Sequence, residues 1–219
     1  EDAFKNKKAF IPFVTAGDPS LDVTRELILA MQEAGADLIE IGIPFSDPVA
    51  EGPVIQEADD RALSAGVTTD KIFDTVDDIA DKIHVPIVFM TYINPIYVYG
   101  VEKFAKRAKA CGAAGVIVPD VPFEEKEEIR GSFEAEGLVV ISMVAPTSAD
   151  RVRMIAKEAK GFLYCVSSLG VTGVRTEIGT AIGDLIQTVK EECSIPCAIG
   201  FGISTPEQAE AMAKISDGA

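Results

Sequence analysis

The chain has 219 residues, 47% of them hydrophobic, and a formal net charge of −15. This length and apolar content allow a substantial core, and we expect a single domain spanning residues 1–219. The acidic charge disfavours nucleic acids and anionic membranes as partners. No apolar run approaches the roughly 20 residues that cross a bilayer. The first residues lack the charged-then-apolar pattern of a signal segment, so we expect a cytoplasmic protein.

Cysteine and histidine usage limits the chemistry that is available. Cys193 and Cys197 flank Pro196 at a spacing typical of neither zinc ribbons nor redox motifs, and the other two cysteines stand alone. We therefore expect reduced cysteines that serve packing. His84 is the only histidine, so no zinc site is expected and nucleophilic catalysis has one candidate base. Chemistry then falls to carboxylates, tyrosines and the backbone.

The segment 38–56, LIEIGIPFSDPVAEGPVIQ, holds the two main candidates for catalysis. Three isoleucines alternate on one face of a predicted strand at 38–43, which places Glu40 on the opposite, inward face. A carboxylate there is costly unless it has a partner or a task. Glu51 lies in the irregular loop that follows. Two acids in unlike surroundings suit general acid–base catalysis. In the structural alternative, Glu40 forms a salt bridge in the core and Glu51 is a solvated charge on a loop.

Strand-like and helix-like segments alternate along the whole chain. The predicted strands are 10–15, 38–43, 86–91, 115–118, 139–144, 162–166 and 196–200. The predicted helices are 21–34, 54–64, 71–82, 101–110, 124–135, 150–159, 181–192 and 207–214. We expect Asp18 or Ser20 to cap the first helix, and a loop rather than a helix at 92–97. Regular alternation of this kind predicts a parallel sheet covered by helices.

Two layouts of such a sheet compete, an open doubly wound sheet and a closed barrel. The turn after the first strand, AGDPS, lacks the G-x-G-x-x-G of the first layout. Short, even units and the inward-facing Glu40 favour a (β/α)8 TIM barrel, whose active site lies at the carboxyl ends of the strands, where Thr15 falls. Only seven units are counted, and the final SDGA is typical of a lead-in to another strand. Since a seven-stranded sheet would expose two edges, we expect a barrel whose eighth βα unit is missing from the sequence as given.

Glycine-bearing turns follow the last two predicted strands. GVTG ends at Gly173, and GFG ends at Gly202. Backbone N–H groups in such turns can bind phosphate, which barrels frequently hold in this region, although ordinary turn glycines are the alternative. Apolar side chains could form a slot for an aromatic substrate or pack in the core, and they are Phe13, Ile55, Tyr92, Tyr164 and Phe201.

Six stretches, in this order and at these separations, resemble the alpha subunit of tryptophan synthase. They are PFVTAGDP, IEIGIPFSDPVAEGPVIQ, MTYINPI, VPDVP, GVTG and GFGIS. The resemblance covers essentially the whole chain and implies a TIM barrel that cleaves indole-3-glycerol phosphate, a phosphate ester, to indole and glyceraldehyde 3-phosphate by a retro-aldol lyase reaction. It also implies a beta-subunit partner in an alpha2beta2 assembly. That partner carries pyridoxal phosphate and receives the indole, so no cofactor is expected in this chain.

The resemblance also assigns residue roles. Glu40 matches the general acid–base glutamate that protonates the indole ring carbon and takes the proton of the substrate hydroxyl. Glu51 matches the second acid, the base toward the indole N–H. The family pattern is A-D-G-P, however, and one extra methylene moves the carboxylate by roughly 1–1.5 Å, a misplacement that can cost about 100-fold in rate. Pocket positions match Phe13, Tyr92, Tyr164 and Phe201, the mobile loop matches Thr172 and Gly173, and a phosphate-binding backbone position matches Gly202.

Two other functions stay open on the sequence alone. A catalytically impaired barrel that mainly activates a beta partner is consistent with Glu51 and with the missing last unit. Another phosphate-binding TIM-barrel isomerase is also conceivable, but such enzymes usually need metal-ligating histidines or a Lys/His pair, and this chain has one histidine.

Overall fold

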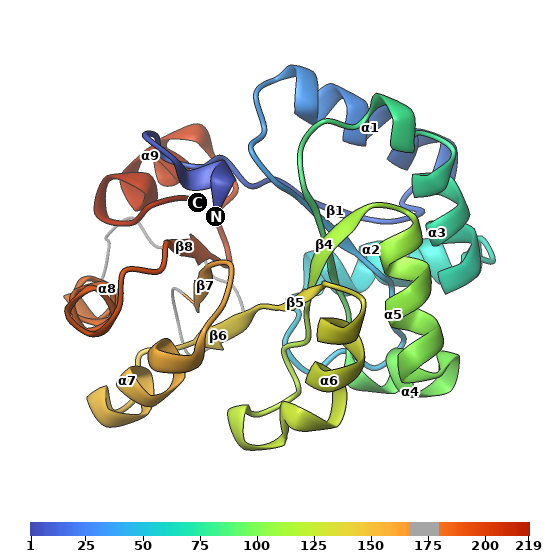
Figure 1. Ribbon diagram of the computed structural model, residues 1–219. Coiled ribbons are helices and arrows are strands. Elements are labelled where there is room, and N and C mark those ends of the chain that lie inside the picture. Colours follow the sequence, from blue (N-terminus) through green and yellow to red (C-terminus); the bar gives the residue numbers. More distant parts are fainter. Residues whose placement is uncertain (167–179) are drawn as a thin grey trace. The chain divides into compact units, whose positions relative to one another are not determined.

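The computed structural model describes residues 1–166 and 180–219, which divide into two compact units (Figure 1). The first unit contains Glu1–Phe10 and Ile141–Ala219, and the second contains Ile11–Val140. Both units are built from parallel strands that alternate with helices, as the sequence predicts. The single domain spanning residues 1–219 stays a prediction.

The second unit is a five-stranded parallel sheet in the order β1–β2–β3–β4–β5. Its strands are β1 (Phe13–Thr15), β2 (Ile39–Gly42), β3 (Ile87–Met90), β4 (Ala113–Ile117) and β5 (Val139–Val140). The connections contain α1 (Leu21–Glu33), α2 (Pro53–Ser64), α3 (Thr69–Asp77), α4 (Ile93–Tyr99), α5 (Val101–Ala110) and α6 (Glu127–Ala135), with 3-10 turns η2 (Ala80–Lys82) and η3 (Phe123–Glu125). Strands that neighbour each other in sequence therefore neighbour each other in the sheet.

Helices cover one face of this sheet and enclose its core. α1 packs on α3, α3 on α5 and α5 on α6 (Figure 1). Ile39 and Ile41 of β2 lie fully buried in this core, together with Phe89 of β3. The Phe73 ring of α3 meets the Phe89 ring edge-on at 5.2 Å and the Phe104 ring of α5 at 5.1 Å. Because side chains alternate along a strand, residues next to these isoleucines point to the other face of the sheet.

The first unit holds a three-stranded parallel sheet in the order β6–β7–β8. Its strands are β6 (Ser142–Val144), β7 (Leu163–Val166) and β8 (Cys197–Gly200), and its helices are α7 (Ala149–Glu158), α8 (Thr180–Glu192) and α9 (Pro206–Ile215), with η1 (Asp2–Phe4) at its start. Gly218 forms parallel bridges to Ala198 of β8 and to Ala9. The segment SDGA thus continues the sheet beside β8, in agreement with its predicted role as a lead-in to a strand.

Two local predictions were wrong. The strand expected at 139–144 is divided at Ile141, because its first half pairs with β4 and its second half with β7. The loop expected at 92–97 contains helix α4, whose first N–H group, that of Ile93, donates to the Asp120 carboxylate at 3.0 Å. A cap that is 27 residues away leaves no signal in the local sequence. The predicted cap of α1 is confirmed, since the Ser20 hydroxyl accepts the Val23 N–H.

Gly115 in β4 allows a test of how closely the strands pack, and Gly131 in α6 is its control. A Cβ added to Gly115 in β4 would lie 2.3 Å from the Val139 carbonyl oxygen, a backbone atom that cannot move aside cheaply. Gly131, on the exposed side of α6, has nothing within 4 Å of such an atom. We predict that G115A lowers the free energy of unfolding by about 1–3 kcal/mol, whereas G131A raises it by about 0.5–1 kcal/mol. Urea denaturation checks both, and a harmless G115A would contradict the packing described for β4 and β5.

Candidate active site

Glu40 lies in the middle of β2, on the face of the sheet opposite the helices. Its strand register places it between Phe13 of β1 and Val88 of β3. The residue is only 5% exposed. Burial removes the water that would stabilise a carboxylate, and it raises the pKa of Glu40 from 4.5 to about 8. The predicted inward acid is therefore a carboxyl group that stays largely protonated at neutral pH.

Strand β1 supplies two of the predicted site residues on the same face, Phe13 at its start and Thr15 at its end. A Cβ at Gly42 would lie 2.5 Å from the Phe13 ring, so the ring lies directly over the glycine two residues beyond Glu40. Thr15 is 6% exposed, and its hydroxyl oxygen is buried without a hydrogen-bond partner among the described residues. Such a group is rare in proteins unless a ligand or water satisfies it. This edge of the sheet is therefore equipped to contact a bound molecule.

Glu51 is held in place by Tyr92, a residue of the segment that follows β3. The Tyr92 hydroxyl donates to Glu51 Oε1 at 3.1 Å and accepts the Ala50 N–H at 3.1 Å. Gln56 of α2 donates its side-chain amide to the Glu51 carbonyl at 2.8 Å. Burial raises the pKa of Glu51, and the hydrogen bond from Tyr92 partly opposes this shift. The pKa of Tyr92 is also raised, first by burial, so the phenol remains a donor.

Asp59 is a buried acid on α2, 6% exposed, that was not predicted from the sequence. Burial raises its pKa to about 7. Its only sequence signal is that it follows Ala58 and precedes Ala62, which mark the buried face of the helix. An acid at the edge of such a face is equally typical of a solvated charge, so the pattern alone does not single it out.

The remaining predicted residues are distributed over α2 and the first unit. Ile55 is half-buried on α2. Tyr164 of β7 is 7% exposed, and its hydroxyl lies where a Cβ of Gly200 would be. Phe201 and Gly202 both have positive φ angles, of 92° and 71°, so β8 ends in a tight turn with Gly202 exposed. Thr172 and Gly173 lie outside the described residues.

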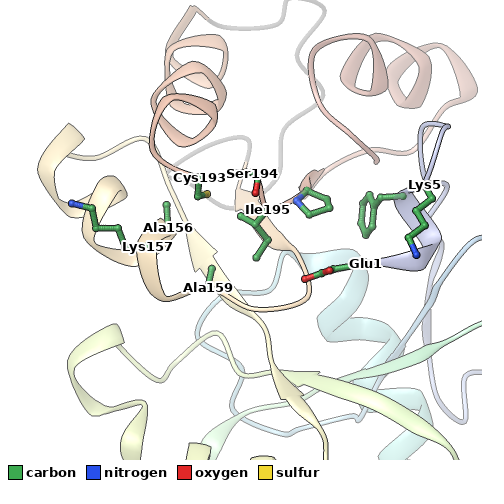
Figure 2. Close-up of a pocket in the computed structure, with 10 residues that line it drawn as sticks. Glu1, Lys5, Ala156, Lys157, Ala159, Cys193, Ser194 and Ile195 are labelled. Carbon is green, nitrogen blue, oxygen red and sulfur yellow. The ribbon is translucent and has the colours of Figure 1, made fainter.

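A cavity of about 430 Å³ opens in the first unit (Figure 2). It contains none of the predicted site residues. Two lysines at its rim are already in ion pairs, Lys157 with Glu192 at 3.0 Å and Lys5 with Asp2. Its lining consists of Glu1, Phe4, Lys5, Ala156, Lys157, Ala159, Cys193, Ser194, Ile195 and Pro196. The chemistry predicted from the sequence therefore lies elsewhere.

Within residues 1–166 and 180–219, no group of three or more His, Cys, Asp or Glu residues could hold a metal ion. No helix in the same ranges is long and apolar enough to cross a membrane. All four cysteines are free thiols.

Parallel strands that alternate with helices define an α/β protein. A buried carboxyl on β2 and a half-buried carboxyl in the loop after β2 form its candidate site. The family model described as tryptophan synthase alpha chain matches residues 1–219. The chain belongs to this family, which is a family of lyases.

Individual relatives agree with the family model. The chain is 48% identical to the tryptophan synthase alpha chain of Lacticaseibacillus casei over 217 residues, which cover 99% of this chain and 82% of the relative. It is 50% identical to that of Halalkalibacterium halodurans over 213 residues, covering 97% and 80%. Among solved structures, tryptophan synthase from Mycobacterium tuberculosis superposes with a TM-score of 0.91 at 33% identity, covering 99% and 85%. The tryptophan synthase complex from Pyrococcus furiosus superposes with a TM-score of 0.87 at 38% sequence identity, and the match covers 97% of this chain and 86% of that chain. These matches confirm the predicted α/β TIM-barrel fold class.

The raised pKa of Glu40 has a consequence for stability. Between pH 4.5 and about 8 the folded chain keeps a proton on Glu40 that the unfolded chain releases. The wild type should therefore lose stability as the pH rises through this interval, and level off above it. Because E40Q cannot titrate, we predict that its advantage in free energy of unfolding over the wild type grows by a few kcal/mol from pH 4.5 to 8. Urea denaturation at successive pH values measures this difference, and a constant difference would contradict the buried, protonated Glu40.

Proposed function

We propose that Glu40 and Glu51 carry out the proton transfers of indole-3-glycerol phosphate cleavage, the retro-aldol reaction that releases indole and glyceraldehyde 3-phosphate in tryptophan biosynthesis. The observation that carries this assignment is the burial of Glu40 opposite the helices, with its pKa raised to about 8. A carboxyl group that is neutral at working pH can act as an acid, and its conjugate base, once formed, recaptures a proton readily.

The first half of the reaction uses Glu40 as an acid. It gives its proton to C3 of the indole ring, while the Glu51 carboxylate accepts the proton of the indole N–H. The ring then carries a C=N bond that can accept an electron pair. Glu40, now an ionised carboxylate in a buried site, has a strong tendency to regain a proton.

The second half restores both groups. Glu40 removes the proton of the side-chain hydroxyl next to the ring, and the electron pair of that O–H bond forms the aldehyde. The bond between C3 and the side chain breaks, its electrons return to the ring, and the indole nitrogen recovers its proton from Glu51. The products are indole and glyceraldehyde 3-phosphate, and no atom or electron is left over.

The contacts of Glu51 support its role despite the departure from the aspartate of the family motif. Its longer side chain ends at the Tyr92 hydroxyl, 3.1 Å away, so the extra methylene is taken up by a defined partner. The hydrogen bond favours the ionised form that a base requires, against the effect of burial. We assign Tyr92 to the orientation of Glu51 as well as to the lining of the substrate pocket.

The other predicted contacts complete the substrate site. We propose that the indole ring and side chain lie against apolar and hydroxyl-bearing residues, which are Phe13, Thr15, Ile55, Tyr92, Tyr164, Thr172 and Phe201. The unsatisfied Thr15 hydroxyl is supporting evidence for a polar contact there. Backbone N–H groups at Gly173 and Gly202 are assigned to the phosphate, and the tight turn at Gly202 is compatible with that role.

We further propose that this chain needs no cofactor and assembles with a pyridoxal-phosphate-dependent beta subunit in an alpha2beta2 complex. The solved structure from Pyrococcus furiosus is a tryptophan synthase complex. Free cysteines fit the reducing conditions of the cytoplasm, where we place the enzyme. We also propose that residues 1–219 act as one domain of the TIM-barrel class.

Substitution of the two acids tests the assignment. Because a positioned acid or base contributes roughly 10²–10⁴-fold, E40Q should reduce indole release from indole-3-glycerol phosphate by at least about 1,000-fold, and E51Q by about 100-fold. The assay follows indole formation, and E57Q, an exposed substitution on α2, is the matched control. Unchanged turnover in E40Q would contradict the proposed reaction.

Removal of the Tyr92 hydroxyl tests the orientation of Glu51. Y92F keeps the ring but loses both the donor to Glu51 and the acceptor for Ala50. We predict a loss of about 10-fold in kcat, since a misplaced catalytic group reacts less often. Y97F, on an exposed tyrosine of α4, should retain wild-type kcat. An equal effect of Y92F and Y97F would show that the hydroxyl does not position Glu51.

A further inference from the structure

The turn after β4 presents Asp120 at the same edge of the sheet as Tyr92, which follows the neighbouring strand β3. The Val121 N–H donates to the Val118 carbonyl at 3.3 Å, so the chain turns at Pro119 and Asp120. Proline fixes its own backbone angle φ, which stiffens such a turn. Aspartate is common in turns, where its carboxylate often accepts an N–H group of the same turn. The carboxylate of Asp120 instead accepts an N–H group of a distant segment.

That segment begins where β3 ends. Met90 of β3 pairs with Ile117 of β4, and the Thr91 N–H donates to the Ile117 carbonyl at 3.0 Å. The two strands run in parallel, so the residues that follow each of them emerge side by side. The Ile93 N–H donates to Asp120 Oδ1 at 3.0 Å and to Oδ2 at 3.3 Å. Both oxygens of one carboxylate therefore hold a single backbone group that is 27 residues away.

This hydrogen bond fixes the peptide group that joins Tyr92 to Ile93. The N–H of Ile93 and the carbonyl of Tyr92 lie in one rigid plane. Holding the N–H therefore restricts rotation about the backbone angle ψ of Tyr92. The Tyr92 side chain, in a residue that is 3% exposed, packs on the Phe45 ring with centroids 5.5 Å apart. Backbone and ring are thus held by separate contacts, and together they set the direction of the Tyr92 side chain.

The hydroxyl at the end of this side chain is the one that contacts the proposed base. It donates to Glu51 Oε1 and accepts the Ala50 N–H, both at 3.1 Å. Burial raises the pKa of Tyr92 most, and the charges of Glu51 and Asp120 add to the shift, so the phenol stays a donor. A small rotation of the backbone is enlarged at the far end of a long, rigid side chain. A displacement of about 1 Å at a catalytic group can cost about 100-fold in rate.

We propose that Asp120 is a positioning residue for Glu51, acting through the Ile93 N–H and the Tyr92 hydroxyl. This inference rests on the proposed role of Glu51. It assigns to Asp120 no contact with substrate and no proton transfer. The alternative is a helix cap alone, because Ile93 is the first residue of α4. Loss of a cap would lower stability and leave kcat unchanged.

Substitutions at Asp120 separate these two roles by kinetics. D120A removes both acceptor oxygens and should lower kcat about 5-fold with KM unchanged within about twofold, because orientation is lost and binding contacts remain. D120L removes the oxygens while keeping the volume, and replaces D120A should that variant fold poorly. D120N keeps an acceptor oxygen for the Ile93 N–H and should restore kcat to within about twofold of the wild type.

Two control variants match the chemistry that is lost at Asp120. E125Q removes the charge of an exposed acid in η3, a few residues further along the chain. T68A removes a helix cap in the same unit, since the Thr68 hydroxyl accepts the Lys71 N–H at the start of α3. Both should leave kcat unchanged, and T68A should lower stability.

The chain has four tyrosines, which allows a measurement that needs no substrate. Carbon-13 NMR of protein labelled at the hydroxyl-bearing ring carbon of tyrosine gives one signal for each, and Y92F assigns that of Tyr92. We expect D120L to shift the Tyr92 signal in the same direction as E51Q does, because each weakens the hydrogen bond between the hydroxyl and Glu51. E125Q should leave this signal in place.

A double substitution completes the test, with indole release from indole-3-glycerol phosphate as the assay. If Asp120 acts through the Tyr92 hydroxyl, D120L should have no further effect on kcat in a Y92F background. Losses that multiply, wild-type kcat in D120L, an unshifted Tyr92 signal, or a D120N variant as impaired as D120L would each overturn the positioning role alone. An E51Q variant with full activity would instead overturn the assignment of Glu51, and the positioning role with it.

Discussion

The burial of an ionisable group at Glu40 is the constraint on which the candidate site depends. β2 is four residues long, and every one of them is buried. The isoleucines on one side lie in the helix-covered core, which leaves Glu40 on the opposite face with no freedom to turn toward the helices. The group responds to burial by holding its proton. The shift to a pKa of about 8 corresponds to a preference for the neutral form on the order of 5 kcal/mol.

In the proposed reaction a protonated acid needs a second group that is ionised and can accept a proton. The loop after β2 contains such a candidate, Glu51. Glu51 is half-buried and receives a hydrogen bond from Tyr92, which supports its ionised form. The two carboxyls therefore have different environments, in keeping with the acid and base roles proposed for them. This division depends on the loop between β2 and α2, which is tied to Tyr92 at Ala50 and to α2 at Glu51.

The parts of the fold that follow from period-two alternation were predictable from the sequence. Strand β2 and the inward direction of Glu40 required only that three isoleucines share one face. Contacts between residues distant in sequence were not predictable in the same way. Helix α4 begins where Asp120 caps Ile93, and the strand at 139–144 divides because its halves find different partners. In both places the deciding atom belongs to another part of the chain.

The candidate site shows the same division. Glu40 and Glu51 carry signals in their own segment, an acid within an apolar alternation and an acid in a proline-rich loop. Asp59 carries none, because its burial depends on how α2 packs in the folded chain. The extra methylene of Glu51 suggested a misplaced base, yet its meaning depends on where Tyr92 lies, and the structure places that hydroxyl 3.1 Å from Oε1.

The most direct test of the acid role is the ionisation of Glu40 itself. Carbon-13 NMR of protein labelled at the glutamate side-chain carboxyls, titrated with pH and compared with E40Q for assignment, reports the pKa of this one group. We predict a pKa of about 8, far above that of the exposed glutamates. A Glu40 that titrates near its ordinary value of 4.5 would contradict the central claim, because the group would then be ionised at neutral pH and unable to serve as the acid.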